Sequence, residues 1–169
     1  LSTIDVYGDY KGTITEESPT SPSSLYGHSK LFCEKAVSAY SSMKGIDYHI
    51  LRIGHVYGPG EEKYQKVIPT TISNILKNNS VEMWGDGEDL RSFIYIQDVV
   101  EAIAQSVKLR ELARIINVVS ANTISIKDLI TKLIEIGGQK TKMVAHETSA
   151  PTKDSVFDNS KLKQHLLSK

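Results

Sequence analysis

The sequence alternates between short runs rich in β-branched and aromatic residues and longer runs with the apolar spacing of a helix. The β-rich runs are residues 1–6, 48–53, 81–84, 93–96, 115–119 and 143–145. The runs with helical character are residues 26–44, 67–78, 98–109, 125–136 and 159–167. Strands that alternate with helices in this way are typical of α/β proteins, in which helices cover a largely parallel sheet. We therefore predict an α/β fold.

Two predicted helices carry signals at their ends. Ser24 precedes the helix at residues 26–44 and can cap its first turn, and Gly45 can end it in a left-handed conformation. Asp98 is the candidate cap for the helix at residues 98–109.

Composition places the chain among ordinary globular proteins. Of its 169 residues, 40% are hydrophobic, and 20 basic side chains balance 20 acidic ones, which predicts neither a nucleic-acid-binding surface nor a polybasic membrane contact. No apolar run reaches the length of a transmembrane helix. A single cysteine, Cys33, allows no internal disulfide and no cysteine-based zinc site, and we expect a buried, inert thiol. The histidines have no metal-ligand spacing, and we expect a cytoplasmic protein without a metal.

The segment Tyr26-Gly27-His28-Ser29-Lys30 is the most informative one for function. Tyr26 and Lys30 are four residues apart, so they share one face if the segment is helical. A phenol has an ordinary pKa of about 10, and a nearby ammonium group favours its ionised form. A tyrosine in this setting can exchange a proton with a substrate hydroxyl. The spacing alone also occurs on the surface of many helices, and that is the alternative.

Four segments in a fixed order give the motif its context, and they are residues 15–30, 51–60, 84–91 and 93–100. With these segments the chain resembles the extended short-chain dehydrogenase/reductase superfamily, and within it the NAD-dependent nucleotide-sugar epimerases and dehydratases. The resemblance covers nearly the whole chain but only the later half of the family's fold. It implies a partial Rossmann-like fold, the later half of a doubly wound parallel sheet, joined to a small α/β subdomain that binds the substrate.

The resemblance also implies a division of the chain into two parts. Residues 1–60 would form the C-terminal part of the dinucleotide-binding domain and carry the catalytic helix. Residues 61–169 would form mainly the nucleotide-sugar-binding subdomain, with some segments returning to the first domain.

The resemblance assigns candidate catalytic roles to Thr3, Tyr26 and Lys30. It implies that Tyr26 is the acid/base at the sugar 4-hydroxyl, while Lys30 favours the phenolate and holds the nicotinamide ribose. Thr3 matches the family's catalytic serine or threonine, whose hydroxyl can donate to a developing oxyanion or relay a proton. The alternative for Thr3 is an ordinary residue at the end of a strand.

Asp5 is a further candidate catalytic residue, because it stands where the family's 4,6-dehydratases usually carry a glutamate. Aspartate is one methylene shorter, and Ile4 replaces the neighbouring acid of those enzymes. A displacement of about 1 Å can cost about 100-fold in rate, and isoleucine cannot protonate a leaving hydroxyl. Epimerisation or 4-keto reduction therefore fits better than dehydration, and Asp5 as a simple polar strand end is the alternative.

Four further residues are implied as contacts of the substrate. Trp84 stands where the family has an aromatic residue that packs against the nucleotide base; the alternative is that Trp84 packs in the core. Arg91 matches the arginine that clamps the diphosphate with its planar fork, and Lys66 matches a second phosphate contact; for both, a solvated surface position is the alternative. His55 stands where the family commonly has asparagine, and it can hydrogen-bond the substrate or the nicotinamide.

Two features weaken or limit the site. At residues 150–154 the family often has an Arg-Pro-Gly-Asp segment, whereas this chain has Ala150 in place of the arginine, so we expect altered nucleotide-sugar binding. The implied cofactor is NAD, with NADP as the alternative, yet no G-x-G-x-x-G loop is found. We therefore expect the chain to be a fragment that by itself binds NAD weakly and is inactive.

The predicted function is that of an NAD-dependent nucleotide-sugar epimerase, with hydride transfer at sugar C4 and a homodimer as the expected assembly. A 4,6-dehydratase, decarboxylase or 4-ketoreductase of the same superfamily is the first alternative. A non-catalytic binding protein with this fold is the second. The expected partner is a nucleotide sugar, and neither nucleic acid nor a membrane is expected.

Overall fold

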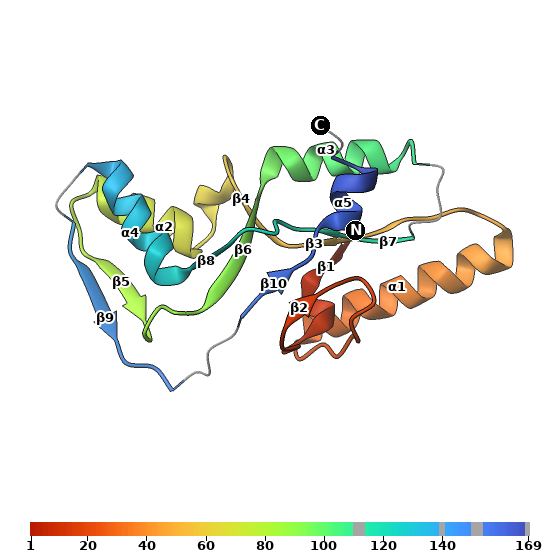
Figure 1. Cartoon of the computed structure of the whole chain (residues 1–169), viewed down its shortest axis with the longest axis horizontal. Helices are drawn as coiled ribbons and strands as arrows, with labels where there is room; N and C mark the ends of the chain where they lie inside the picture. Colours follow the sequence, from red (N-terminus) through yellow and green to blue (C-terminus); the bar gives the residue numbers. More distant parts are fainter. Residues whose placement is uncertain (110–113, 139–140, 150–153, 168–169) are drawn as a thin grey trace.

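The computed structural model describes residues 1–109, 114–138, 141–149 and 154–167, and in them short strands alternate with helices (Figure 1). The strands are β1 (Ser2–Thr3), β2 (Thr13–Ile14), β3 (Ile50–Ile53), β4 (His55–Tyr57), β5 (Val81–Trp84), β6 (Leu90–Tyr95), β7 (Ile115–Val118), β8 (Thr123–Ser125), β9 (Met143–His146) and β10 (Val156–Phe157). The helices are η1 (Ile4–Tyr7), α1 (Leu25–Lys44), η2 (Glu61–Lys63), α2 (Val67–Leu76), α3 (Ile96–Ser106), α4 (Ile126–Gly137) and α5 (Ser160–His165). The predicted α/β fold is confirmed.

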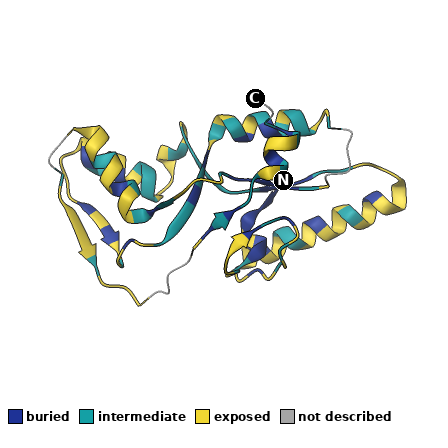
Figure 2. Cartoon of the chain, viewed as in Figure 1, coloured by how far each residue is buried: buried dark blue, intermediate teal, exposed yellow. Residues whose placement is uncertain are grey.

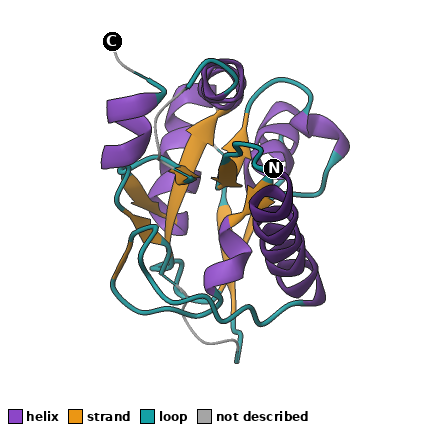
Figure 3. Cartoon of the chain, turned by 90° about the vertical axis from the view of Figure 1, so that its right-hand side faces the viewer, coloured by secondary structure: helices purple, strands orange, loops and turns teal. Residues whose placement is uncertain are grey.

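A parallel sheet with the strand order β1-β3-β7 forms one half of the molecule. Helix α1 lies on one side of this sheet, and α3 and α5 lie on the other (Figures 1 and 3). Both faces of the sheet are covered, and the strands β3 and β7 are accordingly mostly apolar. The core on the α3 and α5 side contains Leu51, Ile94, Val99, Ala102, Ile116, Val118, Leu162 and Leu166.

The other half is built from α2, α4 and the parallel pair β5 and β9. Val81 and Met83 of β5 are buried against Ile75 of α2 and Ile130 of α4. Glu82 and Trp84 alternate with them and are exposed, as expected for a strand with one buried face. The sheet β4-β6-β8 runs between the two halves, with β6 parallel to β4 and antiparallel to β8.

The helix signals were right for α1 and wrong for α3. The Ser24 hydroxyl accepts a hydrogen bond from Gly27 N at 3.0 Å, and Gly45 ends α1 with a left-handed φ of 63°. Helix α3 instead begins at Ile96, directly after β6, with no side-chain cap, and Asp98 lies in its first turn. Packing of the turn against the core decides this start, because most helical stability in proteins comes from tertiary contacts.

Two other expectations are corrected by the structure. The predicted strand at residues 1–6 ends at Thr3 and continues as the 3₁₀-helix η1. Cys33 is exposed on α1 rather than buried. The structure also buries the carboxylate of Glu16, which accepts a hydrogen bond from Asn117 N at 2.8 Å.

In the part of the chain that the structure describes, no helix combines the length and the apolar character needed to cross a bilayer. Within the same residues, no group of three or more His, Cys, Asp or Glu side chains is arranged to hold a metal ion.

Candidate active site

The first part of the site is the point where β1 turns into η1. Thr3 is the last residue of β1 and the N-cap of η1, and its Oγ1 accepts a hydrogen bond from Asp5 N at 3.3 Å. Thr3 is buried, whereas Asp5 is exposed in the first turn of η1. The cap therefore holds the Thr3 hydroxyl at the carboxyl end of a strand, where α/β folds place their ligands.

The second part is the first turns of α1, which carry Tyr26 and Lys30. The Lys30 Nζ lies 5.9 Å from the centroid of the Tyr26 ring, so the two side chains share one helix face. Lys30 Nζ also donates a hydrogen bond to the Leu1 carbonyl oxygen at 3.3 Å. The Tyr26 side chain is 52% exposed, which leaves the ring accessible to a ligand.

Gly27 brings these two parts together. A Cβ atom at position 27 would lie 2.7 Å from the Asp5 carbonyl oxygen and 2.9 Å from Pro22 Cβ. Real Cβ atoms essentially never approach a backbone oxygen so closely, so α1 can pack at this distance only with glycine here. The structure therefore places the segment of Tyr26 and Lys30 directly against the segment of Thr3 and Asp5.

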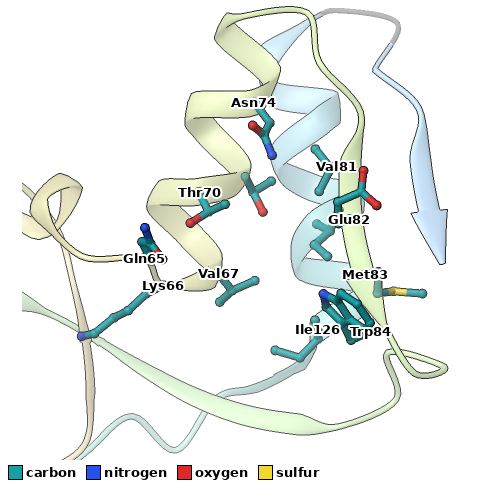
Figure 4. A pocket seen from close by; sticks show the side chains of 12 residues that line it. Gln65, Lys66, Val67, Thr70, Asn74, Val81, Glu82, Met83, Trp84 and Ile126 are labelled. Carbon is teal, nitrogen blue, oxygen red and sulfur yellow. The ribbon is translucent and has the colours of Figure 1, made fainter. Parts of the chain in front are cut away.

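The four predicted substrate contacts line two neighbouring cavities, one between α2 and the strands β4 and β6, the other between α2, β5 and α4. His55, Lys66 and Arg91 line one cavity of about 310 Å³. Lys66 also lines the other, of about 370 Å³, together with Trp84 (Figure 4). Figure 4 shows Trp84 beside Ile126 at one end of this second cavity and Asn74 at the other. The two cavities share Lys66, Val67 and Ile126 in their linings.

Ion pairs hold both cations of these cavities near carboxylates. Arg91 Nη2 lies 2.9 Å from Asp89 Oδ2, and Lys66 Nζ lies 3.1 Å from Glu61 Oε1. Arg91 is only 20% exposed, so its guanidinium is presented from a defined position rather than from a freely moving side chain.

Trp84 belongs to the surface and not to the core, with 68% of its side chain exposed. One face of its ring stacks on His146 with centroids 4.7 Å apart. His146 in turn contacts the Glu82 carboxylate, and this hydrogen bond lowers the pKa of Glu82. The core-packing alternative for Trp84 is therefore excluded.

A buried polar network beneath the site was not predicted from the sequence. Glu34 of α1 pairs with Arg52 of β3, and Arg52 also contacts Tyr7 of η1, which donates to Asn117 of β7. The only hint in the sequence was an arginine inside a run that reads as a buried strand.

Of the segment at residues 150–154, residues 150–153 lie outside the described part of the chain. The carboxylate of Asp154 accepts a hydrogen bond from Leu90 N at 3.1 Å.

Comparison with known proteins identifies the family. The profile of the NAD dependent epimerase/dehydratase family matches residues 1–118. An uncharacterised UDP-glucose epimerase of Bacillus subtilis, YtcB, is 31% identical over 167 residues, which are 98% of this chain and 52% of that protein. A dTDP-glucose 4,6-dehydratase of Streptomyces griseus is 32% identical over 140 residues, which cover 82% of this chain and 42% of that enzyme.

A solved structure agrees with these relatives. The UDP-glucuronic acid 4-epimerase from Bacillus cereus, in complex with UDP-glucuronic acid and NAD, matches with a TM-score of 0.86 and 28% identity, over 99% of this chain and 54% of its own. The chain therefore belongs to the NAD dependent epimerase/dehydratase family, which confirms the resemblance and the partial Rossmann-like fold. It spans about half the length of the relatives it matches.

Proposed function

We propose that the chain carries the proton-transfer and substrate-binding residues of an NAD-dependent nucleotide-sugar 4-epimerase. The observation that supports this most is the placement of Lys30 Nζ 5.9 Å from the Tyr26 ring, on a helix turn that packs against the segment of Thr3. The ammonium group lies beside the phenol, whose oxygen is the group proposed to exchange a proton with a sugar hydroxyl.

In the proposed reaction, Tyr26 Oη takes the proton of the C4 hydroxyl while that carbon is oxidised, and it returns the proton when the carbon is reduced. Thr3 Oγ1 stabilises the same oxygen by hydrogen bonding as its charge changes. Reduction from the opposite face of the sugar ring inverts the configuration at C4. The atoms balance, because the proton and the hydride removed in the first half are both restored in the second.

The residues present fit the ribose end of NAD. Lys30 has three N–H donors and uses one of them on the Leu1 carbonyl, so donors remain for the ribose hydroxyls. Tyr26, beside it, and His55, which lines the smaller cavity, are the other proposed contacts. When bound, NAD would supply the acceptor and donor of the hydride.

The two cavities fit the remaining parts of a nucleotide sugar. Arg91 and Lys66 offer charged donors to a diphosphate, and Trp84 offers an aromatic face to a base.

The test is an assay of the protein as its gene encodes it, supplied with NAD and a panel of UDP-, GDP-, CDP- and dTDP-sugars, with the products separated by chromatography and identified by NMR. We expect the C4 epimer of one of these sugars to form. Tyr26→Phe should lower kcat by at least about 100-fold, because general acid–base catalysis contributes about 10²–10⁴. Unchanged activity in Tyr26→Phe would reject the mechanism and favour a non-catalytic role for this site.

A 4,6-dehydratase is the second candidate, and the exposed carboxylate of Asp5 favours it. Asp5 lies two residues after Thr3, on the segment against which Gly27 packs, where it could remove a proton from a second sugar carbon. Asp5→Asn separates the two candidates. A dehydratase would lose formation of the 4-keto-6-deoxy product, whereas an epimerase would keep most of its kcat.

We also infer a homodimer that forms through α1. Large apolar side chains on this helix are exposed, among them Phe32 and Met43 at 73% and 78% (Figure 2). Light scattering on the protein should give twice the mass of one chain. The variant Phe32→Glu should give the mass of a single chain, because it places a charge on the exposed apolar face of α1.

A further inference from the structure

Helix α1 is attached to the sheet mainly by polar groups, which is unusual for a helix of 20 residues. Its buried residues are Gly27, Glu34 and Ser41, spaced seven apart along one face. Figure 2 shows the rest of the helix as largely exposed. A surface helix normally buries a stripe of large apolar side chains. On α1 the middle of the buried stripe is instead a carboxylate.

The Glu34 carboxylate is fully engaged by donors on two strands. Arg52 donates from Nε to Oε1 at 3.0 Å and from Nη2 to Oε2 at 2.7 Å. The Ser2 hydroxyl donates to Oε1 at 2.5 Å. The Glu34 and Arg52 side chains are only 6% and 4% exposed. A buried bidentate pair of this kind has a fixed geometry, because both planar groups must align.

Arg52 is itself held by η1 and β7. Its Nη1 donates to the Tyr7 hydroxyl at 2.8 Å, and its guanidinium lies 4.8 Å from the centroid of the Tyr7 ring. Tyr7 then donates to Asn117 Oδ1 at 2.7 Å. Burial lowers the pKa of Arg52, but the hydrogen bonds to Glu34 and Tyr7 more than offset this and raise it overall. The guanidinium therefore keeps its charge.

This network ends on both segments of the candidate active site. Ser2 precedes Thr3 on β1, and Tyr7 closes the 3₁₀-helix that Thr3 caps. Glu34 follows Lys30 by one turn and Tyr26 by two turns on α1. A shift of Glu34 would move this rigid helix relative to β1 and η1.

We infer that Glu34 and Arg52 are positioning residues, which set the distance of Tyr26 and Lys30 from Thr3 through a buried ion pair. The inference rests on the proposed function, because it concerns the geometry of the proton transfer. A displacement of about 1 Å in such a site can cost about 100-fold in rate. The pair does not touch the substrate, so its loss should lower kcat much more than it raises KM.

The test uses three variants in the protein as its gene encodes it. Glu34→Gln removes the charge at nearly constant volume, and Arg52→Lys keeps the charge but loses the bidentate fork. Lys35→Gln is the control, because it also removes one charge, of the opposite sign, at the next, exposed position of α1. We expect kcat to fall by about 10–100-fold in the first two with KM within about threefold, and no change in the control.

Two further readouts separate positioning from simple stability. The pH profile of kcat should change in Glu34→Gln, because the distance between Lys30 and Tyr26 and their placement against Thr3 are altered. Amide hydrogen exchange in residues 25–44 should accelerate in Glu34→Gln and not in Lys35→Gln. If Glu34→Gln is unfolded at the assay temperature, the double variant Glu34→Met/Arg52→Met takes its place, because replacing both ions often preserves stability.

The outcomes distinguish this inference from the proposed function. Suppose that Tyr26→Phe loses activity, but folded Glu34→Gln or the double variant keeps the kcat and the pH profile of the parent. This result would overturn the positioning role alone. Activity retained in Tyr26→Phe would reject the proposed function, and with it the role of Glu34 in that reaction. Loss of kcat at constant KM in a folded variant, with a shifted pH profile, supports the inference.

Discussion

Gly27 on α1 lies so close to Asp5 on η1 that a methyl group at position 27 would stand 2.7 Å from the Asp5 carbonyl oxygen. The same methyl group would also lie 2.9 Å from Pro22 Cβ. The contact joins the two segments that carry the candidate catalytic residues, Tyr26 next to Gly27 and Thr3 two residues before Asp5. The absence of a side chain at Gly27 thus sets how closely helix α1 can approach η1.

The first prediction concerns this contact. Gly27→Ala should lower the free energy of unfolding by up to about 2 kcal/mol, because overpacking costs about 1–3 kcal/mol while alanine gains about 1 kcal/mol in a helix. Urea denaturation measures the change. Lys35→Ala, at an exposed position of the same helix, should stay within about 0.5 kcal/mol of the parent. Greater stability in Gly27→Ala would show that α1 can move away from η1 without loss.

The second prediction concerns Tyr7 and alkaline pH. Burial raises the pKa of Tyr7, so the folded chain holds the phenol proton more tightly than the unfolded chain does. The resulting stability is complete below about pH 10, the ordinary value, and is lost as the pH rises through the raised folded-state pKa. We therefore expect the melting temperature to fall steeply above pH 10.

The variant Tyr7→Phe tests the origin of that fall. It should be less stable at pH 7 by about 1–3 kcal/mol, because Asn117 and Arg52 lose a buried partner, and its melting temperature should depend less on pH above 10. Tyr40→Phe removes a phenol that is 57% exposed, and it should leave the pH profile unchanged. Parallel pH profiles for the parent and Tyr7→Phe would contradict the assignment.

The third prediction concerns phosphate recognition by Arg91. Arg91→Gln should weaken the binding of UDP or dTDP by about 10–100-fold, because a hydrogen bond to a charged group contributes about 1.5–3 kcal/mol. The affinity of Arg91→Lys should lie between those of the parent and of Arg91→Gln, since lysine keeps the charge without the planar fork. Calorimetry gives the dissociation constants. Lys127→Gln removes an exposed cation near Glu88, and an equal loss there would point to a general charge effect.

The fourth prediction uses Trp84, the only tryptophan in the sequence. A base that enters the cavity in Figure 4 should stack near the exposed indole and quench its fluorescence. Inorganic diphosphate, which has no base, should not quench the fluorescence. Trp84→Leu should weaken nucleotide binding by about 10–100-fold, in line with about 1–3 kcal/mol per stacked base. Equal quenching by both ligands would place the base elsewhere.

Local signals were sufficient for several elements of the fold. Ser24 and Gly45 bracket α1 as expected, because a side-chain cap and a left-handed glycine act within one turn of the residue that provides them. The same reasoning failed for Asp98, since the start of α3 is decided by a core that β6 and α3 build together. It also failed for Cys33, whose exposure depends on which segments pack over it.

The sequence by itself determined the alternation of strands and helices, the spacing of Tyr26 and Lys30, and the family. These follow from periodicity and from motifs that are read within a few residues. Only the tertiary structure decided that α1 is held by Glu34 and Arg52, and that Tyr7 and Asn117, 110 residues apart, complete the same network. Charged residues are buried only where partners from distant segments meet them, and that meeting is a property of the folded chain.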